Sequence, residues 1–299
     1  MSRLRALVFA TALSVGLGGC ALADPLAPVP DDSDAIVVGS QDYYSNEIVA
    51  EIWAQSLEGA GFTVRREFRI GQREVYLPEV EAGAIELFPE YNGPLLQAWD
   101  PATTARTPAE VEAQLRLQLP AGLRLLPAAP AADQDSYVVT TELARAHGLE
   151  QIADLARLPA PVTLGANSEA VARPHGPAGL ARTYGVEATL TPIEDSGGPL
   201  TLKALRDGDI QVAVLYTANP ALADPTLTTL ADPKGLFLAA NVVPLARHDL
   251  PEQAVAVINA VNERLTTAEL LELNKRSVDT QAPAAQIAEQ WLAQQGLAP

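Results

Sequence analysis

Residues 35–88 read AIVVGSQDYYSNEIVAEIWAQSLEGAGFTVRREFRIGQREVYLPEVEAGAIELF, and this stretch decides the fold class. Short apolar runs predict strands, and apolar residues spaced three and four apart predict helices. The pattern gives five alternating elements: strands at 35–39, 62–68 and 85–88, and helices at 44–60 and 74–81. Alternating strands and helices are typical of a parallel sheet that is covered by helices.

The same pattern recurs in the second half of the chain. Strands are expected at 162–166, 189–193 and 210–215, helices at 179–184 and 200–207, and further helices from 251 to 297. The sequence therefore predicts an α/β protein with two lobes of similar build. Ligands of such sheets bind beyond the carboxyl ends of the strands. Tyr91 and Tyr216 each lie just past such an end, so we expect both tyrosines to face a cleft between the lobes.

The first 33 residues have the features of a secretory leader and a linker. Arg3 and Arg5 precede an apolar run at 6–17, which is shorter than the roughly 20 residues that a membrane-spanning helix needs. The run ends Leu17-Gly18-Gly19-Cys20, which resembles a bacterial lipobox, so residues 1–19 are expected to be removed and Cys20 to carry lipid. A plain secretory signal with a coincidental cysteine is the alternative. Residues 20–33 are rich in Pro, Ala and Asp and predict a flexible tether.

The composition excludes several classes of function. The chain has 299 residues, 48% of them hydrophobic, and a formal net charge of −17, which disfavours nucleic acid because phosphates need Lys and Arg. One cysteine excludes an internal disulfide and a cysteine-based zinc site. The three histidines lack metal-ligand spacing, and no nucleophile elbow or phosphate loop is present. We therefore expect no metal, no cofactor and no enzymatic activity.

Several blocks of sequence, taken in order, resemble the substrate-binding proteins of osmoprotectant ABC importers, the glycine betaine, choline and carnitine group. The most specific block is Pro89-Glu90-Tyr91-Asn92-Gly93. Others lie at 38–40, 70–75, 132–137, 173–176, 202–208, 241–245 and 265–274. The resemblance implies a type II periplasmic-binding fold whose lobes, each built on a mixed, mostly parallel sheet, close around a solute. Lobe 1 would hold residues 34–137 and 241–299, and lobe 2 residues 138–240.

The resemblance also implies partners and a cellular location. The closed, monomeric protein would dock on an ABC permease that works with a separate ATPase, on the outer side of the cell membrane, held there by its lipid alone. The solute would be small and cationic.

A quaternary ammonium group has no hydrogen-bond donor, so proteins hold it with the faces of aromatic rings and a nearby carboxylate. By family position, Tyr91, Tyr137 and Tyr216 match three walls of such a cage, and Asp135 matches a polar residue beside the cation. Further candidates for ligand contact are Gln41, Tyr43 and Thr217. The alternative for any single tyrosine is an ordinary half-buried ring.

Three departures from the family pattern bear on the choice of solute. Ala240 stands where a fourth cage tyrosine is usual, Pro94 where a threonine is usual, and Gln41 where a lysine is usual. The lysine and the threonine help to hold the carboxylate of glycine betaine, so that side of the site is weakened. Arg173 can still clamp a carboxylate through two parallel hydrogen bonds, although Arg73 and Arg173 could equally form surface ion pairs. Choline, carnitine, another betaine and a bulkier cation all remain open.

Other functions compatible with the sequence are a sensor subunit of the same fold and a pocket re-purposed for another small molecule. A hydrolase that uses Glu90 and Asp135 as an acid–base pair is a further alternative. His175, close to Arg173, is a candidate for the rim of the cleft.

Overall fold

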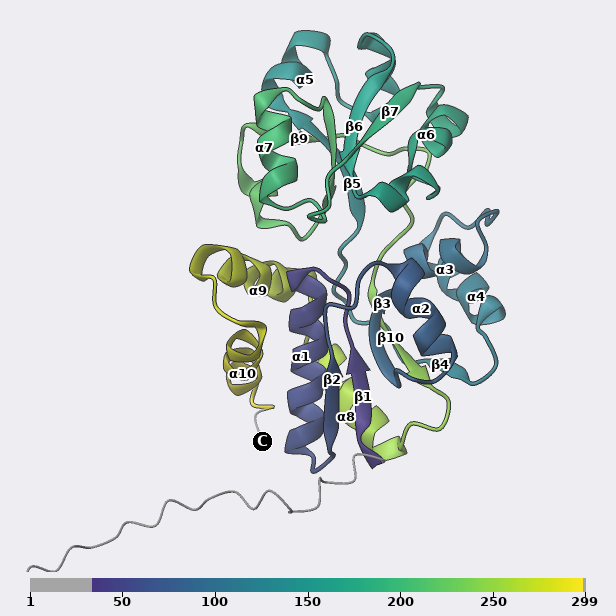
Figure 1. Ribbon diagram of the computed structural model, residues 1–299, viewed down its shortest axis with the longest axis vertical. Coiled ribbons are helices and arrows are strands. Elements are labelled where there is room, and N and C mark those ends of the chain that lie inside the picture. Colours follow the sequence, from purple (N-terminus) through teal and green to yellow (C-terminus); the bar gives the residue numbers. More distant parts are fainter. Residues whose placement is uncertain (1–33, 298–299) are drawn as a thin grey trace, which may run out of the picture. The chain divides into compact units, whose positions relative to one another are not determined.

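The strand predicted at 35–39 lies inside a five-stranded sheet. The structure is a computed structural model that describes residues 34–297 (Figure 1). The predicted signal peptide at 1–19, the lipid-carrying Cys20 and the tether at 20–33 lie outside the described residues. No helix within 34–297 is long and apolar enough to cross a membrane.

The first sheet has the strand order β2-β1-β3-β10-β4. Strand β1 pairs in parallel with β2 and β3, whereas β10 pairs antiparallel with β3 and β4. The bounds are β1 Ile36–Gly39, β2 Val64–Glu67, β3 Leu87–Tyr91, β4 Leu123–Leu125 and β10 Val242–Arg247.

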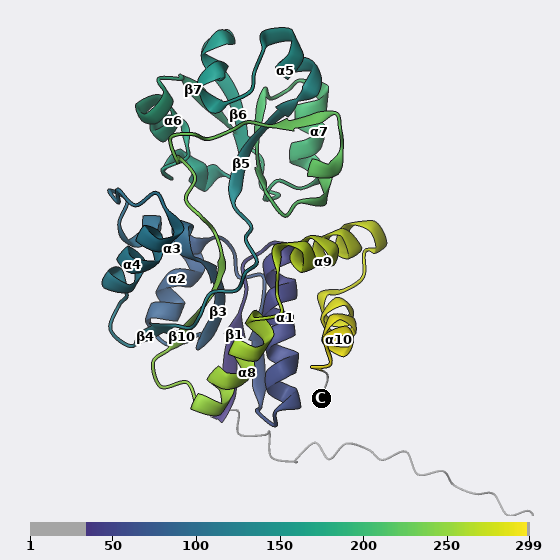
Figure 2. The ribbon, with the colours of Figure 1, turned by 180° about the vertical axis from the view of Figure 1, so that it is seen from behind.

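Helices cover both faces of this sheet (Figures 1 and 2). Because side chains alternate along a strand, Ile36 and Val38 enter one core and Val37 enters the other. The first core is shared with α1 (Tyr44–Gly59), α8 (Glu252–Asn262), α9 (Thr267–Thr280) and α10 (Ala284–Gln295). The second core is shared with α2 (Arg73–Glu81), α3 (Asn92–Trp99) and α4 (Pro108–Gln118).

The second sheet repeats the plan with the order β7-β6-β8-β5-β9. Strand β6 pairs in parallel with β7 and β8, and β5 pairs antiparallel with β8 and β9. The strands are β5 Asp135–Thr140, β6 Val162–Ala166, β7 Ala188–Pro192, β8 Val212–Tyr216 and β9 Leu227–Thr229. Its helices are α5 Thr141–His147, α6 Pro177–Tyr184 and α7 Pro199–Asp207, with short 3-10 turns η2 Ile152–Arg157, η3 Ser168–Val171 and η4 Pro220–Ala223.

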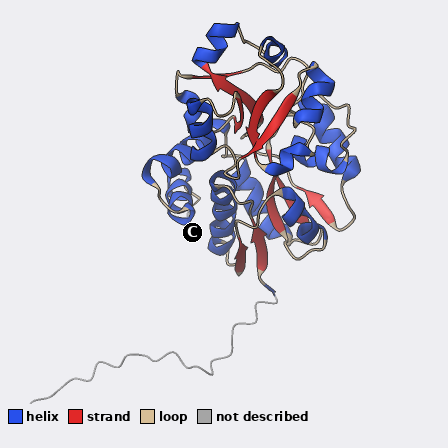
Figure 3. Ribbon diagram, turned by 45° about the horizontal axis from the view of Figure 1, so that its top comes forward, coloured by secondary structure: helices blue, strands red, loops and turns tan. Residues whose placement is uncertain are grey.

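Helices flank the strands of both sheets (Figure 3), and the predicted two-lobed α/β fold class is confirmed. Two antiparallel stretches of chain join the sheets. Ala129 N donates to Val242 O at 2.8 Å, and Asp133 N donates to Ala240 O at 2.9 Å. The lobe boundary expected between residues 137 and 138 falls inside β5.

The strand that carries Tyr91 is longer than the apolar pattern suggests. The sequence predicts an end at residue 88, whereas β3 runs to Tyr91. Pro89 lies opposite Pro244 in the antiparallel pair. Neither proline can donate a hydrogen bond, and this register places both where the ladder needs no donor. Tyr91 and likewise Tyr216 are thus the last residues of their strands, not residues beyond them.

Candidate functional site

Three tyrosines from both lobes meet where the strands of the two sheets end. The Tyr43 hydroxyl donates to the Tyr91 hydroxyl at 2.6 Å, and the ring of Tyr43 stacks on that of Tyr216 with 5.0 Å between centroids. Tyr43 immediately precedes α1, Tyr91 ends β3 and Tyr216 ends β8. Burial raises the pKa of all three hydroxyls, so they stay neutral at physiological pH. We call these three residues the tyrosine cluster.

A close contact with the backbone that joins the two sheets, which we call the hinge, holds Tyr91 in place. Gly93 N donates to Ala239 O at 3.0 Å, and a Cβ on Gly93 would lie only 2.4 Å from that oxygen. Glycine is therefore required directly after Tyr91-Asn92. Ala240, at the position where the resemblance predicts a fourth cage tyrosine, is buried in the same core as Tyr43 and Tyr91.

Asp133 is a buried carboxylate beside the tyrosine cluster, and the sequence did not single it out. It is 4% exposed, and one carboxylate oxygen accepts from Ala218 N at 2.8 Å. Burial raises the pKa of Asp133 to about 7, and the nearby charge of Asp135 acts in the same direction. Its charge in turn raises the pKa of Tyr43 and Tyr91. The only signal in the sequence is its place within the block at 132–137.

Asp135 opens β5 and is paired in register with Tyr216. Its carboxylate lies 4.0 Å from His175 Nδ1 and accepts no hydrogen bond from any residue within 34–297. Burial lowers the pKa of His175, so the imidazole is neutral at physiological pH. Asp135 is therefore a carboxylate that no charged cation within residues 34–297 pairs with directly. The expectation that His175 lies close to the cleft fits its position on this wall.

Arg173 reaches from the second lobe to the first. Its Nε and Nη2 lie 3.3 and 3.0 Å from the two carboxylate oxygens of Glu74, and Nη2 also donates to Gln72 Oε1 at 3.2 Å. Its turn is tightly packed, because a Cβ on Gly176 would lie 1.7 Å from Ala170 O. Gln72 makes a second link between the lobes by donating to Ser196 Oγ at 3.3 Å.

The idea that Arg73 forms a surface ion pair is wrong, because Arg73 is buried against Glu90. Nε and Nη2 of Arg73 each lie 2.9 Å from a carboxylate oxygen of Glu90, whose side chain is 0% exposed. The Tyr76 hydroxyl and the Tyr91 backbone N–H also donate to this carboxylate, at 2.7 and 2.8 Å. With four donors and no access to solvent, Glu90 has a structural role and is unsuited to acid–base catalysis.

Tyr137 lies apart from the tyrosine cluster. Its ring is fully buried in the core of the second lobe, edge-on to Phe237 with 5.0 Å between centroids, and its hydroxyl donates to the backbone oxygen of His175. Phe237, which the sequence did not flag, also packs against the ring of His175 at 5.6 Å. Tyr137 therefore supports the turn that carries His175.

The last two candidates make backbone contacts. Gln41 is buried in the loop after β1, and its backbone N–H donates to Asn46 Oδ1 at 2.8 Å. The Thr217 hydroxyl accepts from the backbone N–H of Gln134 at 2.8 Å. Gln41 follows β1 and Thr217 follows β8, and neither side chain forms a hydrogen bond with the tyrosine cluster in the described structure.

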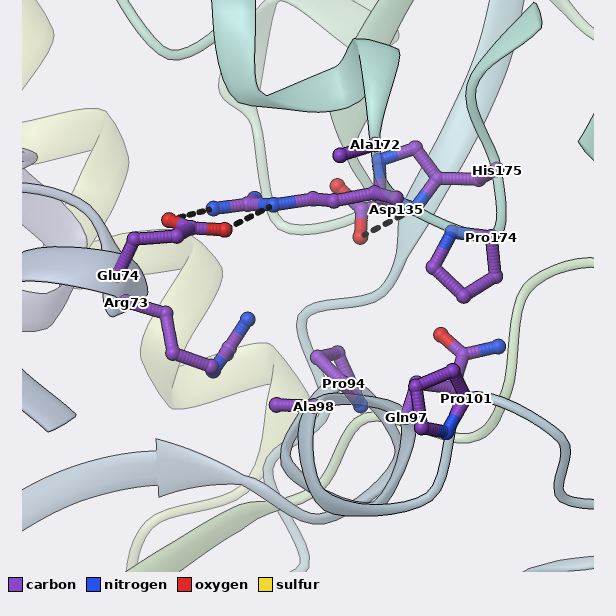
Figure 4. A pocket seen from close by; sticks show the side chains of 11 residues that line it. Arg73, Glu74, Pro94, Gln97, Ala98, Pro101, Asp135, Ala172, Pro174 and His175 are labelled. Atoms are coloured by element: carbon purple, nitrogen blue, oxygen red, sulfur yellow. Dashed lines mark hydrogen bonds and ion pairs between the residues drawn. The ribbon is translucent and has the colours of Figure 1, made fainter. Parts of the chain in front are cut away.

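A cavity of about 180 Å³ lies between the lobes (Figure 4). Pro94 and Ala98 on α3 face Ala172 and His175 across it. Its lining residues are Arg73, Glu74, Pro94, Gln97, Ala98, Pro101, Asp135, Ala172, Arg173, Pro174 and His175. A second cavity of about 20 Å³ shares Asp135, Arg173 and His175 and extends to Tyr216. Within residues 34–297, no three acidic, histidine or cysteine side chains are grouped to hold a metal ion.

Known proteins share this sequence pattern and fold. The family model for the substrate-binding domain of ABC-type glycine betaine transport systems, OpuAC, matches residues 34–294. A solved glycine betaine/carnitine/choline ABC transporter structure is 20% identical, with 88% of this chain and 100% of that chain covered and a TM-score of 0.69. Apo YehZ from Escherichia coli is 21% identical, with 89% and 100% covered and a TM-score of 0.62.

Lactococcal OpuAC, in its closed form with glycine betaine, is 14% identical, with 88% of this chain and 96% of that chain covered and a TM-score of 0.62. At such identities the solved structures show the fold, whereas the family model matches nearly all of the described chain. The family comprises binding proteins of transporters and not enzymes. The chain thus belongs to the substrate-binding domains of ABC-type glycine betaine transport systems.

Proposed function

We propose that this protein captures a quaternary ammonium compatible solute, of the glycine betaine, choline and carnitine class, outside the cytoplasm and delivers it to an ABC importer. Closure of the two lobes retains the solute, and the closed form docks on the permease, whose ATPase is a separate chain. Cys20 carries the lipid that holds the protein at the membrane.

The observation that carries this proposal is the tyrosine cluster next to the carboxylates of Asp133 and Asp135. Aromatic faces and a carboxylate are what a cation without hydrogen-bond donors requires. Tyr43 belongs to the first lobe and Tyr216 to the second, so opening of the lobes separates their stacked rings. A cation can then enter between them, and on closure it replaces the ring-to-ring contact with two cation–π contacts.

Tyr43 offers a physical account of the missing fourth cage tyrosine. Ala240 is buried in the core that it shares with Tyr43 and Tyr91. The ring of Tyr43 is held by the hydroxyl of Tyr91 on one side and by the face of Tyr216 on the other. Tyr43 thus supplies the aromatic wall that Ala240 cannot, together with Tyr91 and Tyr216.

Solute binding is tested with the full-length protein by thermal shift and calorimetry, using choline, glycine betaine, carnitine, proline and sorbitol. A ligand that binds only the folded state at 100 times its Kd adds about 2.7 kcal/mol to stability. We expect at least one quaternary ammonium compound to raise the Tm. A response to proline or sorbitol, with none to any quaternary ammonium, would contradict the proposal.

Lipid attachment is tested separately in bacterial cells that express the full chain. Radiolabelled fatty acid should enter the wild-type protein and not a Cys20→Ser variant. Labelling of both proteins, or of neither, would contradict the role of Cys20 without touching the proposal for solute binding.

A further inference from the structure

Arg173, the cation predicted to clamp a solute carboxylate, is already occupied by a carboxylate of the protein. The two oxygens of Glu74 face Nε and Nη2 at 3.3 and 3.0 Å. This is the paired, two-bond geometry with which a guanidinium binds any carboxylate. Nη2 donates its second hydrogen to Gln72 Oε1, at an N···O distance of 3.2 Å. A solute carboxylate can therefore gain two parallel bonds from Arg173 only by displacing Glu74 or Gln72.

The other positively charged group of the pocket is occupied as well. Arg73 is held by both oxygens of Glu90 at 2.9 Å, and His175 is neutral because burial lowers its pKa. Counting Arg73 and Arg173 as +2 and Glu74, Glu90 and Asp135 as −3, the formal charge around the cavity is 2 − 3 = −1. Such a site favours a net cation over a zwitterion.

The resemblance predicts two further carboxylate contacts, a threonine at position 94 and a lysine at position 41, and neither residue is present. Pro94 lines the cavity and has no hydroxyl to donate. Gln41 carries no charge, and its contact within residues 34–297 is made by its backbone. Arg73 and Arg173 both line the cavity, and each is paired with a carboxylate of the protein. The partner of Arg73 is fully buried, whereas Glu74, the partner of Arg173, is exposed to solvent. A solute carboxylate therefore competes with Glu74 for Arg173.

Glu74 can compete with a solute carboxylate for Arg173, and it can also move away from Arg173. It lies in the first turn of α2, and its side chain is 54% exposed, whereas that of Arg173 is 19% exposed. A group tethered beside its partner acts at an effective concentration of about millimolar or more. A solute present at micromolar concentration displaces it only with a loss of affinity.

We propose that Glu74 is a specificity-determining residue, which holds Arg173 and so makes the site select cations that lack a carboxylate, such as choline, over zwitterions such as glycine betaine. The inference rests on the proposed function and names the solute class within it. Glu74 acts through Arg173, and it also ties the two lobes together, so its removal affects the two kinds of solute in different ways.

The test measures the Kd of choline and of glycine betaine by calorimetry for the full-length wild type, Glu74→Gln and Glu79→Gln. Glu79 lies on the same helix, is exposed and has no side-chain hydrogen bond or ion pair within the described residues, so it controls for the loss of one charge. We expect the wild type to bind choline about tenfold or more tightly than glycine betaine. Glu74→Gln should lower that preference about tenfold, mainly through tighter binding of glycine betaine, and Glu79→Gln should leave it unchanged.

A double variant separates competition from long-range charge. In an Arg173→Gln background, the substitution Glu74→Gln should no longer alter the preference. A wild type that prefers glycine betaine, or a preference that Glu74→Gln leaves unchanged while choline still binds, would overturn the role of Glu74 alone. Failure of choline, glycine betaine and carnitine alike to bind the folded wild type would instead overturn the proposed function, and this inference with it.

Discussion

Acidification from pH 8 to 5.5 should weaken binding of choline, because Asp133 takes up a proton over that range. Burial raises the pKa of Asp133 to about 7. Asp133 attracts the cation only when it is ionised, so the affinity should fall by up to about tenfold at pH 6 and up to about thirtyfold at pH 5.5. The titratable groups that influence Asp133 or are influenced by it are Asp135, Tyr43, Tyr44, Tyr91 and Tyr216, and burial raises the pKa of each tyrosine above this range.

The stability of the unliganded protein should change in the opposite direction. The pKa of Asp133 is higher in the folded state, at about 7, than its ordinary value of 3.8. The folded state therefore binds more protons than the unfolded state between these values, and stability falls as the pH rises through that window. The loss is about 1.4 kcal/mol for each pH unit, or about 4 kcal/mol in total. The substitution Asp133→Asn should remove this loss of stability. At pH values above 7, the unliganded variant should therefore have a higher Tm than the wild type.

Calorimetry in two buffers with different heats of ionisation tests this linkage. Near pH 6, wild-type protein should release close to one proton for each choline bound, and Asp133→Asn should release none and show little pH dependence. The asparagine keeps an oxygen for the Ala218 N–H, so the hinge contact survives. Two outcomes would refute the reasoning. One is a wild-type affinity for choline that does not change between pH 5.5 and 8. The other is an affinity of Asp133→Asn that depends on pH as steeply as that of the wild type.

Three substitutions test other parts of the site. Glu90→Gln should lower the free energy of unfolding by about 3 to 5 kcal/mol, because Arg73 stays buried without its anion; urea denaturation measures this, and an unchanged midpoint would contradict it. Tyr43→Ala removes one aromatic wall worth about 0.5 to 2 kcal/mol and should weaken choline binding about 2- to 30-fold, whereas Tyr43→Phe should bind nearly as wild type in the same titration. Tyr137→Ala should lower stability by about 3 to 5 kcal/mol because its ring fills the second-lobe core; a normal Tm with a more than tenfold loss of choline affinity would instead identify the ring as a cage wall.

Local patterns in the sequence were sufficient for the fold class. The predicted strand at 162–166 and the helix at 44–60 match β6 and α1 closely, because their apolar period is set by which face is buried. The pattern missed β10 and β4, which join the first sheet from far along the chain. Strand pairing of that kind depends on long-range register, which a local period does not encode.

Residue types and motifs also located part of the site. The block that contains Tyr91 and the block that begins with Arg173 both contribute to the cleft or the cluster beside it. The partners of these residues came only from the tertiary structure. Nothing in the spacing of Glu74 and Arg173, which are 99 residues apart, predicts that they form an ion pair across the lobes.

Burial, finally, was decided by the packing of the whole chain. Asp133 and Asp135 stand two residues apart and look alike in sequence, yet Asp133 is held inside the hinge by Ala218 and Asp135 lies on the cavity wall. The sequence by itself determined the alternation of strands and helices and the stock of tyrosines and acids. The tertiary structure decided which of them meet and which are charged, because desolvation and Coulomb interactions depend on distances in space and not along the chain.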